Sequence, residues 1–185
     1  GRIYVICCGS SYNAAKAAAL FFNELARVEL TPILPGEFRA QSARSLKDGD
    51  LVIAVSQSGE TKDLIDVLND VIACGHDVAR IALVNNVNST LAQEKSDLVI
   101  PLRCGPEIAV PATKSFMNQM VVFYCLALDL GARRGDAIGS EPVGRTQHSR
   151  DLATRREKLW ELPALIRETV DSTDGDLEVA AKLYY

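Results

Sequence analysis

Several residue types and sequence patterns that mark well-known sites are scarce in this chain or missing from it. It has only two histidines, His76 and His148, and they stand in unrelated segments. Metal sites and Ser-His-Asp triads usually need a histidine that is grouped with further ligands or catalytic side chains. We therefore expect no histidine-based triad, no bound metal and no cofactor.

Cysteine usage and hydropathy set further limits. The count of five cysteines is odd and no C-x-x-C pattern occurs; the cysteines are Cys7, Cys8, Cys74, Cys104 and Cys125. This usage favours reduced thiols and a cytoplasmic location over a disulfide framework. No apolar run approaches the roughly 20 residues of a membrane-spanning helix and no signal peptide pattern is present, so we expect no membrane partner.

An excess of basic residues is also missing. The chain has 20 Lys and Arg against 24 Asp and Glu, which gives a net charge of −4. This balance argues against nucleic acid as the partner. The 185 residues, 48% of them hydrophobic, are enough for one globular domain with a substantial core. Because the sequence begins almost directly with a strand-like run, we expect it to be a piece of a longer protein.

The two common nucleotide-binding patterns, G-x-x-x-x-G-K-[ST] and G-x-G-x-x-G, do not occur, but another phosphate-binding pattern does. Residues 56–61 read Ser-Gln-Ser-Gly-Glu-Thr, between a buried strand at 51–55 and an amphipathic helix at 62–74. A helix amino terminus attracts anions, and this turn adds hydroxyl and amide donors. Neutral donors suit a phosphate monoester, whereas the plainer alternative is an ordinary Ser/Thr helix cap.

Strands and helices alternate along the sequence. We expect strands at 3–7, 28–34, 51–55, 78–84 and 98–102, helices at 12–26, 62–74, 90–95 and 113–130, and a short helix or loop at 36–45. This alternation predicts an α/β fold, with a doubly wound parallel sheet flanked by helices in a three-layer sandwich. Ligands of such folds bind beyond the carboxyl ends of the strands, where donor-rich turns at 9–11, 56–61 and 85–89 would meet.

Three segments together resemble a known family. They are Cys-Gly-Ser-Ser-Tyr at 8–12, Ser-Gln-Ser-Gly-Glu-Thr at 56–61, and Cys-Gly-Pro-Glu-Ile-Ala-Val at 104–110 followed by Ala-Thr-Lys-Ser-Phe at 112–116. They resemble the sugar isomerase (SIS) domain family, whose fold is flavodoxin-like. The resemblance covers about residues 3–131 and is closest to the first isomerase module of the glutamine–fructose-6-phosphate aminotransferases.

The resemblance implies a site for a sugar phosphate of the fructose 6-phosphate class. In this family the matching turns hold the phosphate and the sugar hydroxyls, with the phosphate on the residues that match Ser56, Ser58 and Thr61. The full implied set is Ser11, Ser56, Gln57, Ser58, Thr61, Val87 and Ser89. For Glu107 two roles remain open: a catalytic carboxylate, or an acid that structures the loop before the long helix.

The implied chemistry is aldose–ketose isomerisation, coupled in the synthase to amination that yields glucosamine 6-phosphate. It needs a base for ring opening, a carboxylate that moves a proton between C1 and C2, and a lysine that forms a Schiff base. In the synthase these groups come largely from a second module, so we assign no catalytic residue in this chain. Two alternatives use the same phosphate site: a sugar-phosphate-sensing regulatory module and a phospho-amino-sugar deglycase.

The remaining expectations concern domains and assembly. We expect residues 1–131 to form the SIS domain and residues 132–185 to form a loop, up to about 146, and a helical linker. Pro163 in the segment Leu-Pro-Ala-Leu-Ile at 162–166 would start a new helix there. The helix at 113–130 is apolar almost all round, which fits either a central core helix or a homodimer interface. The resemblance favours the homodimer.

Overall fold

The computed structural model describes residues 1–108, 111–137 and 142–184. The chain forms two compact units, Gly1–Gly131 and Ala132–Tyr185, which are described separately. The first unit contains the sheet and every turn that the sequence singled out.

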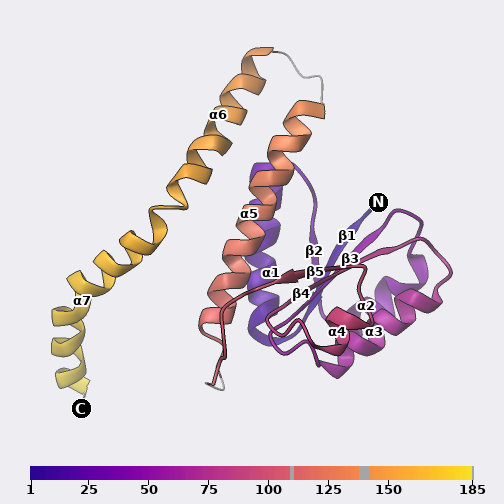
Figure 1. Ribbon diagram of the computed structural model, residues 1–185, viewed down its shortest axis with the longest axis horizontal. Coiled ribbons are helices and arrows are strands. Elements are labelled where there is room, and N and C mark those ends of the chain that lie inside the picture. The colour runs from indigo at the N-terminus through magenta and orange to yellow at the C-terminus, as the bar shows by residue number, and fades with distance from the viewer. Residues whose placement is uncertain (109–110, 138–141, 185) are drawn as a thin grey trace. The chain divides into compact units, whose positions relative to one another are not determined.

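A five-stranded parallel sheet forms the centre of the first unit (Figure 1). Its strands, in chain order, are β1 Ile3–Cys7, β2 Thr31–Ile33, β3 Leu51–Ser56, β4 Ala79–Val84 and β5 Leu98–Pro101. The spatial order is β2-β1-β3-β4-β5, and all four pairings are parallel. This is the flavodoxin-like strand order, so the predicted α/β fold class is confirmed. Strand β2 is short and lies at one edge of the sheet. Pro32 has no backbone N–H, and at an edge this does not interrupt the hydrogen bonding of a central strand.

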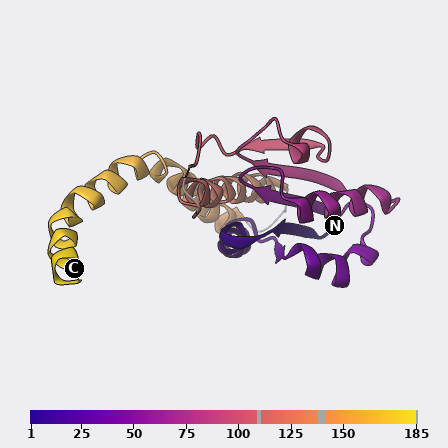
Figure 2. The same cartoon turned by 90° about the horizontal axis from the view of Figure 1, so that it is seen from below.

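Helices cover both faces of this sheet, as Figures 1 and 2 show. Their bounds are α1 Gly9–Phe21, α2 Pro35–Gln41, α3 Lys62–Ala73, α4 Thr90–Gln93 and α5 Lys114–Ala137, with a π-helical turn Phe22–Ala26 and a 3-10 turn Ala43–Ser45. Helices α1 and α5 run side by side on one face, and α2 and α3 lie on the other (Figure 1). The Phe21 and Tyr124 rings, whose centroids are 5.2 Å apart, join α1 to α5.

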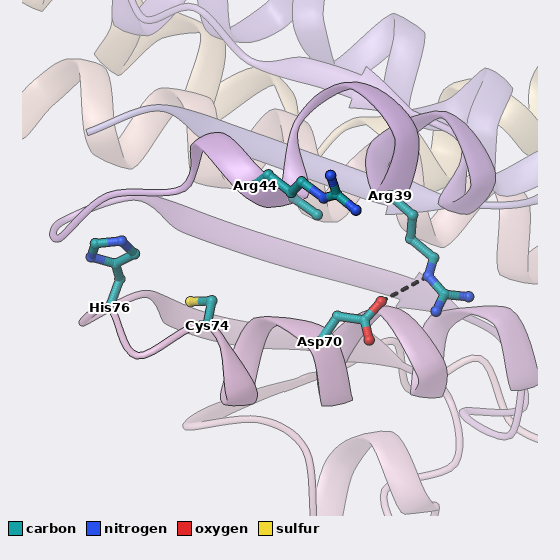
Figure 3. A pocket seen from close by; sticks show the side chains of 6 residues that line it. Arg39, Arg44, Asp70, Cys74 and His76 are labelled. Carbon is teal, nitrogen blue, oxygen red and sulfur yellow. Dashed lines mark ion pairs between the residues drawn. The ribbon is translucent and has the colours of Figure 1, made fainter.

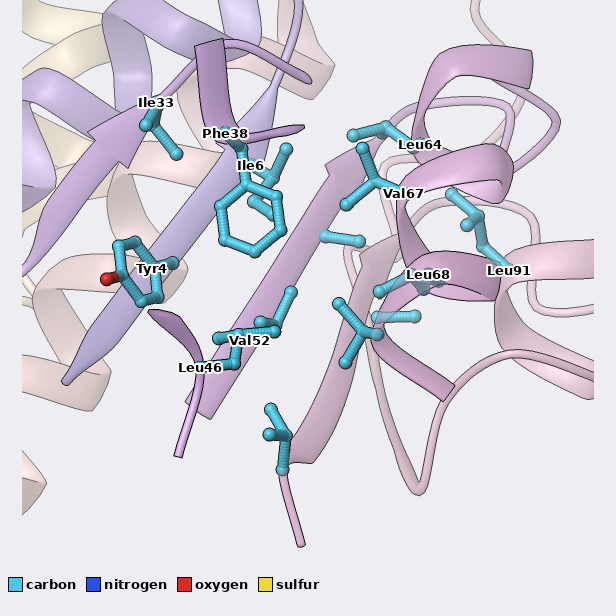
Figure 4. Close-up of a cluster of buried hydrophobic side chains, with 14 of the residues drawn as sticks. Tyr4, Ile6, Ile33, Phe38, Leu46, Val52, Leu64, Val67, Leu68 and Leu91 are labelled. Carbon is cyan, nitrogen blue, oxygen red and sulfur yellow. The ribbon is translucent and has the colours of Figure 1, made fainter. Parts of the chain in front are cut away.

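The larger hydrophobic core lies between the sheet and α2, α3 and α4 (Figure 4). Tyr4 and Ile6 point from β1 into this core, and the Tyr4 ring meets the Phe38 ring edge-on at 5.3 Å. The alternate β1 residues face α1. There the helix presents Ala14, Ala15 and Ala18, all fully buried. Their small side chains allow α1 to approach the sheet closely, which brings the amino end of α1 next to the end of β1.

The carboxyl-terminal part of the chain is more helical than the sequence suggested. Helix α5 continues through Gly131 to Ala137, and α6 Pro142–Lys158 begins within the stretch that was expected to be a loop. A glycine favours a helix end but does not require one, and alanine and arginine are good helix formers. Helix α7, Leu162–Tyr184, begins beside Pro163, at the position where proline fits a first helical turn.

Helix α5 also corrects one hydropathy expectation. Among the described residues, its segment Lys114–Arg134 is the one stretch that is long and apolar enough to cross a membrane. From the sequence we expect no run of that length. Phe123 and Ala127 of α5 are fully buried, but only 33% of the apolar window of this helix is buried.

Candidate functional site

The turn between β3 and α3 is held in shape by its own hydroxyl groups. Ser56 Oγ and Thr61 Oγ1 share a hydrogen bond of 2.9 Å, and Ser56 Oγ also accepts the Gly59 N–H at 3.0 Å. The Ser58 hydroxyl accepts the Glu60 N–H at 3.2 Å. Thr61 is the N-cap residue of α3, so these contacts fold the turn around the first N–H groups of that helix. The result is a concentration of donors at the positive end of a helix dipole.

The turn after β4 packs directly on this first turn. Gly59 has a φ of +72°, and a β-carbon added to it would come within 1.9 Å of Ser89 Oγ. The Gly59 carbonyl accepts the Leu91 N–H at 3.1 Å, and the Gln57 carbonyl accepts the Asn85 N–H at 3.2 Å. The two turns therefore form one body, and the missing side chain of Gly59 is what allows the close contact.

Strand register brings the third turn to the same edge of the sheet. Cys7 at the end of β1 pairs with Val55, and Ser56 pairs with Val84 at the end of β4. The turns after β1, β3 and β4 are thus neighbours at the carboxyl edge. The chain order reverses between β1 and β3, and this switch point is where doubly wound folds bind their ligands.

After β1, helix α1 begins at Gly9, and Cys8 is its N-cap residue. Ser11 lies in the first turn of α1 and is buried, with 9% of its surface exposed. Burial and the nearby charge of Asp63 raise the pKa of the Cys8 thiol. Asp63 belongs to the first turn of α3, and the pairing of β1 with β3 places the starts of the helices that follow these strands at the same edge of the sheet.

The predicted residues Val87 and Ser89 have different surroundings from the rest of the set. Ser89 is 1% exposed and its hydroxyl donates inward to the Asn86 carbonyl at 2.7 Å. Val87 is exposed, and its carbonyl accepts the Gln93 side-chain amide at 2.7 Å. The Ser89 hydroxyl therefore supports the shape of its turn. Ser56, Gln57, Ser58 and Thr61 share the β3–α3 turn, and Ser11 lies in the neighbouring one.

Two polar residues that the sequence analysis did not single out organise this edge. Asn85 holds the segment after β5, because its side chain donates to the Gly105 carbonyl at 2.8 Å and accepts the Cys104 N–H at 3.1 Å. Glu60 Oε1 accepts the Thr90 N–H at 2.8 Å, which turns this carboxylate toward α4. An asparagine directly after a buried strand was the available signal for the first of these residues.

Glu107 caps the amino end of α5. Its Oε1 accepts the Thr113 N–H at 2.9 Å, the Thr113 hydroxyl at 3.2 Å and the Ser115 N–H at 3.2 Å, and its Oε2 accepts the Ser115 hydroxyl. Hydrogen bonds from Ser115 and Thr113 lower the pKa of Glu107 to about 2. A carboxylate held ionised by four donors is poorly suited to carry a proton, so these contacts favour the loop-structuring role over a catalytic one.

A surface pocket of about 490 Å³ lies away from these turns (Figure 3). It is lined by Arg39, Ala43, Arg44, Asp70, Cys74 and His76, and Arg39 pairs with Asp70 at 2.7 Å. His76 follows the end of α3 and precedes β4, so this pocket lies toward the amino ends of the strands. Among the residues that the structure describes, no group of three or more His, Cys, Asp and Glu side chains gathers to hold a metal ion.

A parallel α/β sheet with donor-rich turns at its carboxyl edge is typical of domains that bind phosphorylated ligands. The family comparison identifies the class: the family model described as "SIS domain" matches residues 1–129. The chain therefore belongs to the SIS domain family, and the resemblance drawn from its three motifs is confirmed.

Curated relatives are glutamine–fructose-6-phosphate aminotransferases. The enzyme of Clostridium perfringens is 33% identical over 181 residues, and that of Bradyrhizobium diazoefficiens is 40% identical over 181 residues; each alignment covers 98% of this chain. The chain spans only 27% of the length of either relative. Among solved structures, the C-terminal domain of glucosamine-fructose-6-phosphate aminotransferase from Francisella tularensis matches with a TM-score of 0.67 and 25% identity. That match covers 94% of this chain and 47% of the other.

Proposed function

We propose that residues 1–131 bind a sugar phosphate of the fructose 6-phosphate class and form part of an aminotransferase that makes glucosamine 6-phosphate. The names of the curated relatives support this substrate and reaction. On this proposal, residues 132–185 link the domain to a further isomerase module. The base, the carboxylate and the Schiff-base lysine come from that module, so the chain alone binds substrate but does not convert it.

The β3–α3 turn is the observation that carries the proposal. A phosphate monoester placed at the amino end of α3 meets the partial positive charge of the helix and its first N–H groups. Thr61 and Ser58 present hydroxyl groups there, and Gln57 adds an amide. Ser56 is buried and its hydroxyl is bonded to Thr61, so its role is to orient the Thr61 hydroxyl toward the phosphate.

Two surrounding features add to the fit. Glu60, the one acid in the turn, has its carboxylate bonded to the Thr90 N–H, which draws its negative charge away from an incoming anion. The neighbouring turn with Ser11 lies across the β1/β3 switch point, where the sugar end of the ligand would extend. In this arrangement the phosphate is the anchor and the sugar carbons reach the space between α1 and α3. On this proposal, Val87 lies on the rim of the same site, and Ser89 supports the shape of its turn.

Calorimetric titration with fructose 6-phosphate, and separately with fructose, tests the proposal. We expect heat of binding for the phosphate ester and none for the free sugar. The double substitution Ser56→Ala/Thr61→Ala should abolish binding of the ester. A matched control, Ser172→Ala/Thr173→Ala on the exposed surface of α7, should bind like the unmodified chain. Equal binding of fructose and its phosphate would contradict the proposed anchor.

We also propose a homodimer in the cytoplasm. Leu20 of α1 is 70% exposed and Met117 of α5 is 49% exposed, and both belong to the helices on the same face of the sheet. A second copy would cover such side chains. None of the five cysteines, all of which lie in the described part of the chain, forms a disulfide, which fits a reducing compartment. Sedimentation velocity at several concentrations measures the assembly, and Leu20→Glu/Met117→Glu should shift it toward the monomer.

A further inference from the structure

One face of α5 changes from polar to apolar along its length. Ser115, Gln119, Phe123 and Ala127 are spaced by four residues and so share a face. All four are at most 1% exposed. The two apolar members continue the core of the α1 side, whereas the two polar members occupy the first turns of the helix. A buried helix face that turns polar at one end indicates polar surroundings at that end.

The polar end of this face lies at the level of the strand carboxyl ends. Asn118, next to Gln119, donates from its side chain to the Leu102 carbonyl at 3.0 Å. Leu102 directly follows β5, and its own N–H is bonded to the carbonyl of Val84, the last residue of β4. Phe123, one turn beyond Gln119, meets Phe22, which directly follows the end of α1, so the polar part of this face lies on the amino-terminal side of that contact.

Gln119 has an unusual side chain in this setting. It is 1% exposed, and its Oε1 is the one buried side-chain oxygen or nitrogen atom of the described residues that has no hydrogen-bond partner. Leaving a buried carbonyl oxygen unbonded is costly, and folded proteins rarely tolerate it without a reason. The atom can only accept a hydrogen bond, so the partner that it suits is a hydroxyl or an N–H group.

We propose that Gln119 belongs to the floor of the sugar-phosphate site, where its side-chain oxygen accepts a hydrogen bond from a sugar hydroxyl, directly or through one ordered water. This inference rests on the proposed function. An open-chain ketohexose phosphate carries several hydroxyl donors, whereas its phosphate is taken up by the β3–α3 turn. Gln119 is therefore a specificity residue for the hydroxylated part of the ligand, and the turn is the anchor for its charge.

The variant Gln119→Met tests this role, because methionine has a similar length but no acceptor that matches a carbonyl oxygen. Calorimetry with fructose 6-phosphate should show affinity reduced by about tenfold, the scale of one lost hydrogen bond. Affinity for inorganic phosphate should stay unchanged, and the midpoint of urea unfolding of the ligand-free chain should not fall, because the variant loses an oxygen that has no partner. The control Gln41→Met, at the exposed end of α2, should change neither affinity.

Side-chain NMR gives a second readout that needs no substitution. The Gln119 side-chain amide signals should move on addition of fructose 6-phosphate and stay in place with inorganic phosphate. Unchanged signals with both ligands would overturn the inference, as would unchanged affinity of the methionine variant for fructose 6-phosphate. Equal loss of both affinities together with a lower unfolding midpoint would also overturn it and would indicate a purely structural role. If the unmodified chain bound neither ligand, the proposed function itself would fail.

Discussion

The backbone of Gly59 lies so close to Ser89 that a β-carbon on Gly59 would stand 1.9 Å from Ser89 Oγ and 2.4 Å from Ser89 Cβ. Each residue belongs to a different βα turn, so this contact fixes one turn on the other. The shape of the proposed phosphate site therefore depends on a residue that has no side chain.

The substitution Gly59→Ala should destabilise the domain and remove binding of fructose 6-phosphate. The β-carbon of the alanine would clash with Ser89, and the backbone φ of +72° at this position is unfavourable for alanine. We expect a loss of about 2–4 kcal/mol in the free energy of unfolding, measured with urea. Gly36→Ala is the control, because its β-carbon meets open space on α2. Equal stability of the two variants would show that the turns can separate freely.

Glu107 should make stability depend on pH in the acid range. Its pKa is lowered from 4.5 to about 2 by its bonds to Ser115 and Thr113, so the folded state favours the ionised form. The stabilisation is fully present above pH 4.5 and is lost as pH falls toward 2. The difference in melting temperature between the unmodified chain and Glu107→Gln should therefore shrink over that interval. A difference that stays constant between these pH values would contradict the cap.

Asp50 and Arg2 form a partly buried ion pair, and its loss should lower the free energy of unfolding of the domain. The Asp50 side chain is 3% exposed and accepts bonds from the Arg2 guanidinium, the Arg2 N–H and the Lys47 N–H. Burial opposes its ionisation, but these bonds prevail and lower its pKa to about 2. Asp50→Asn should cost about 2 kcal/mol in urea unfolding at pH 7, the scale of hydrogen bonds to a charged acceptor.

A more exposed pair serves as the comparison for Asp50. Asp97 pairs with Arg80 but is 48% exposed, so Asp97→Asn should cost less than about 1 kcal/mol. Equal losses for the two variants would mean that the burial of Asp50 does not matter.

Asn85→Ala should loosen the segment after β5 while the sheet remains intact. The substitution removes both bonds that hold Cys104 and Gly105. We expect faster hydrogen exchange of the Cys104 amide and little change in the exchange of the β3 amides. Exchange that rises equally in both places would point to global destabilisation instead.

The central strand was predictable because 51–55 is a short apolar run bounded by turn residues, and the sheet buries both its faces. The strand expected at 28–34 is shorter, Thr31–Ile33, because it pairs only with β1 at the sheet edge. The turn for which we propose phosphate binding could be located for a related reason: its hydroxyl and amide groups are adjacent in sequence. The contact of Gly59 with Ser89 was not, because it joins residues 30 positions apart and depends on strand register. The same holds for Glu107, whose role became clear only from its bonds to Ser115.

The helix ends in the carboxyl-terminal part of the chain show a different limit of prediction from sequence. Gly131 was a reasonable helix end, but local preference is weak, and α5 continues to Ala137. Gln119 carried no signal in the sequence, since a glutamine in an apolar helix is normally read as solvent-facing. Only its burial and its unbonded oxygen set it apart.

The register of β1, β3 and β4 has a consequence for how a ligand and the fold depend on each other. The turns that meet at the carboxyl edge come from separate βα units, so no single unit contains the whole of the proposed site. An unfolded chain then has no residual affinity, and any ligand held there favours assembly of the whole sheet. A ligand bound at the proposed site would therefore lengthen the lifetime of the domain against proteolysis.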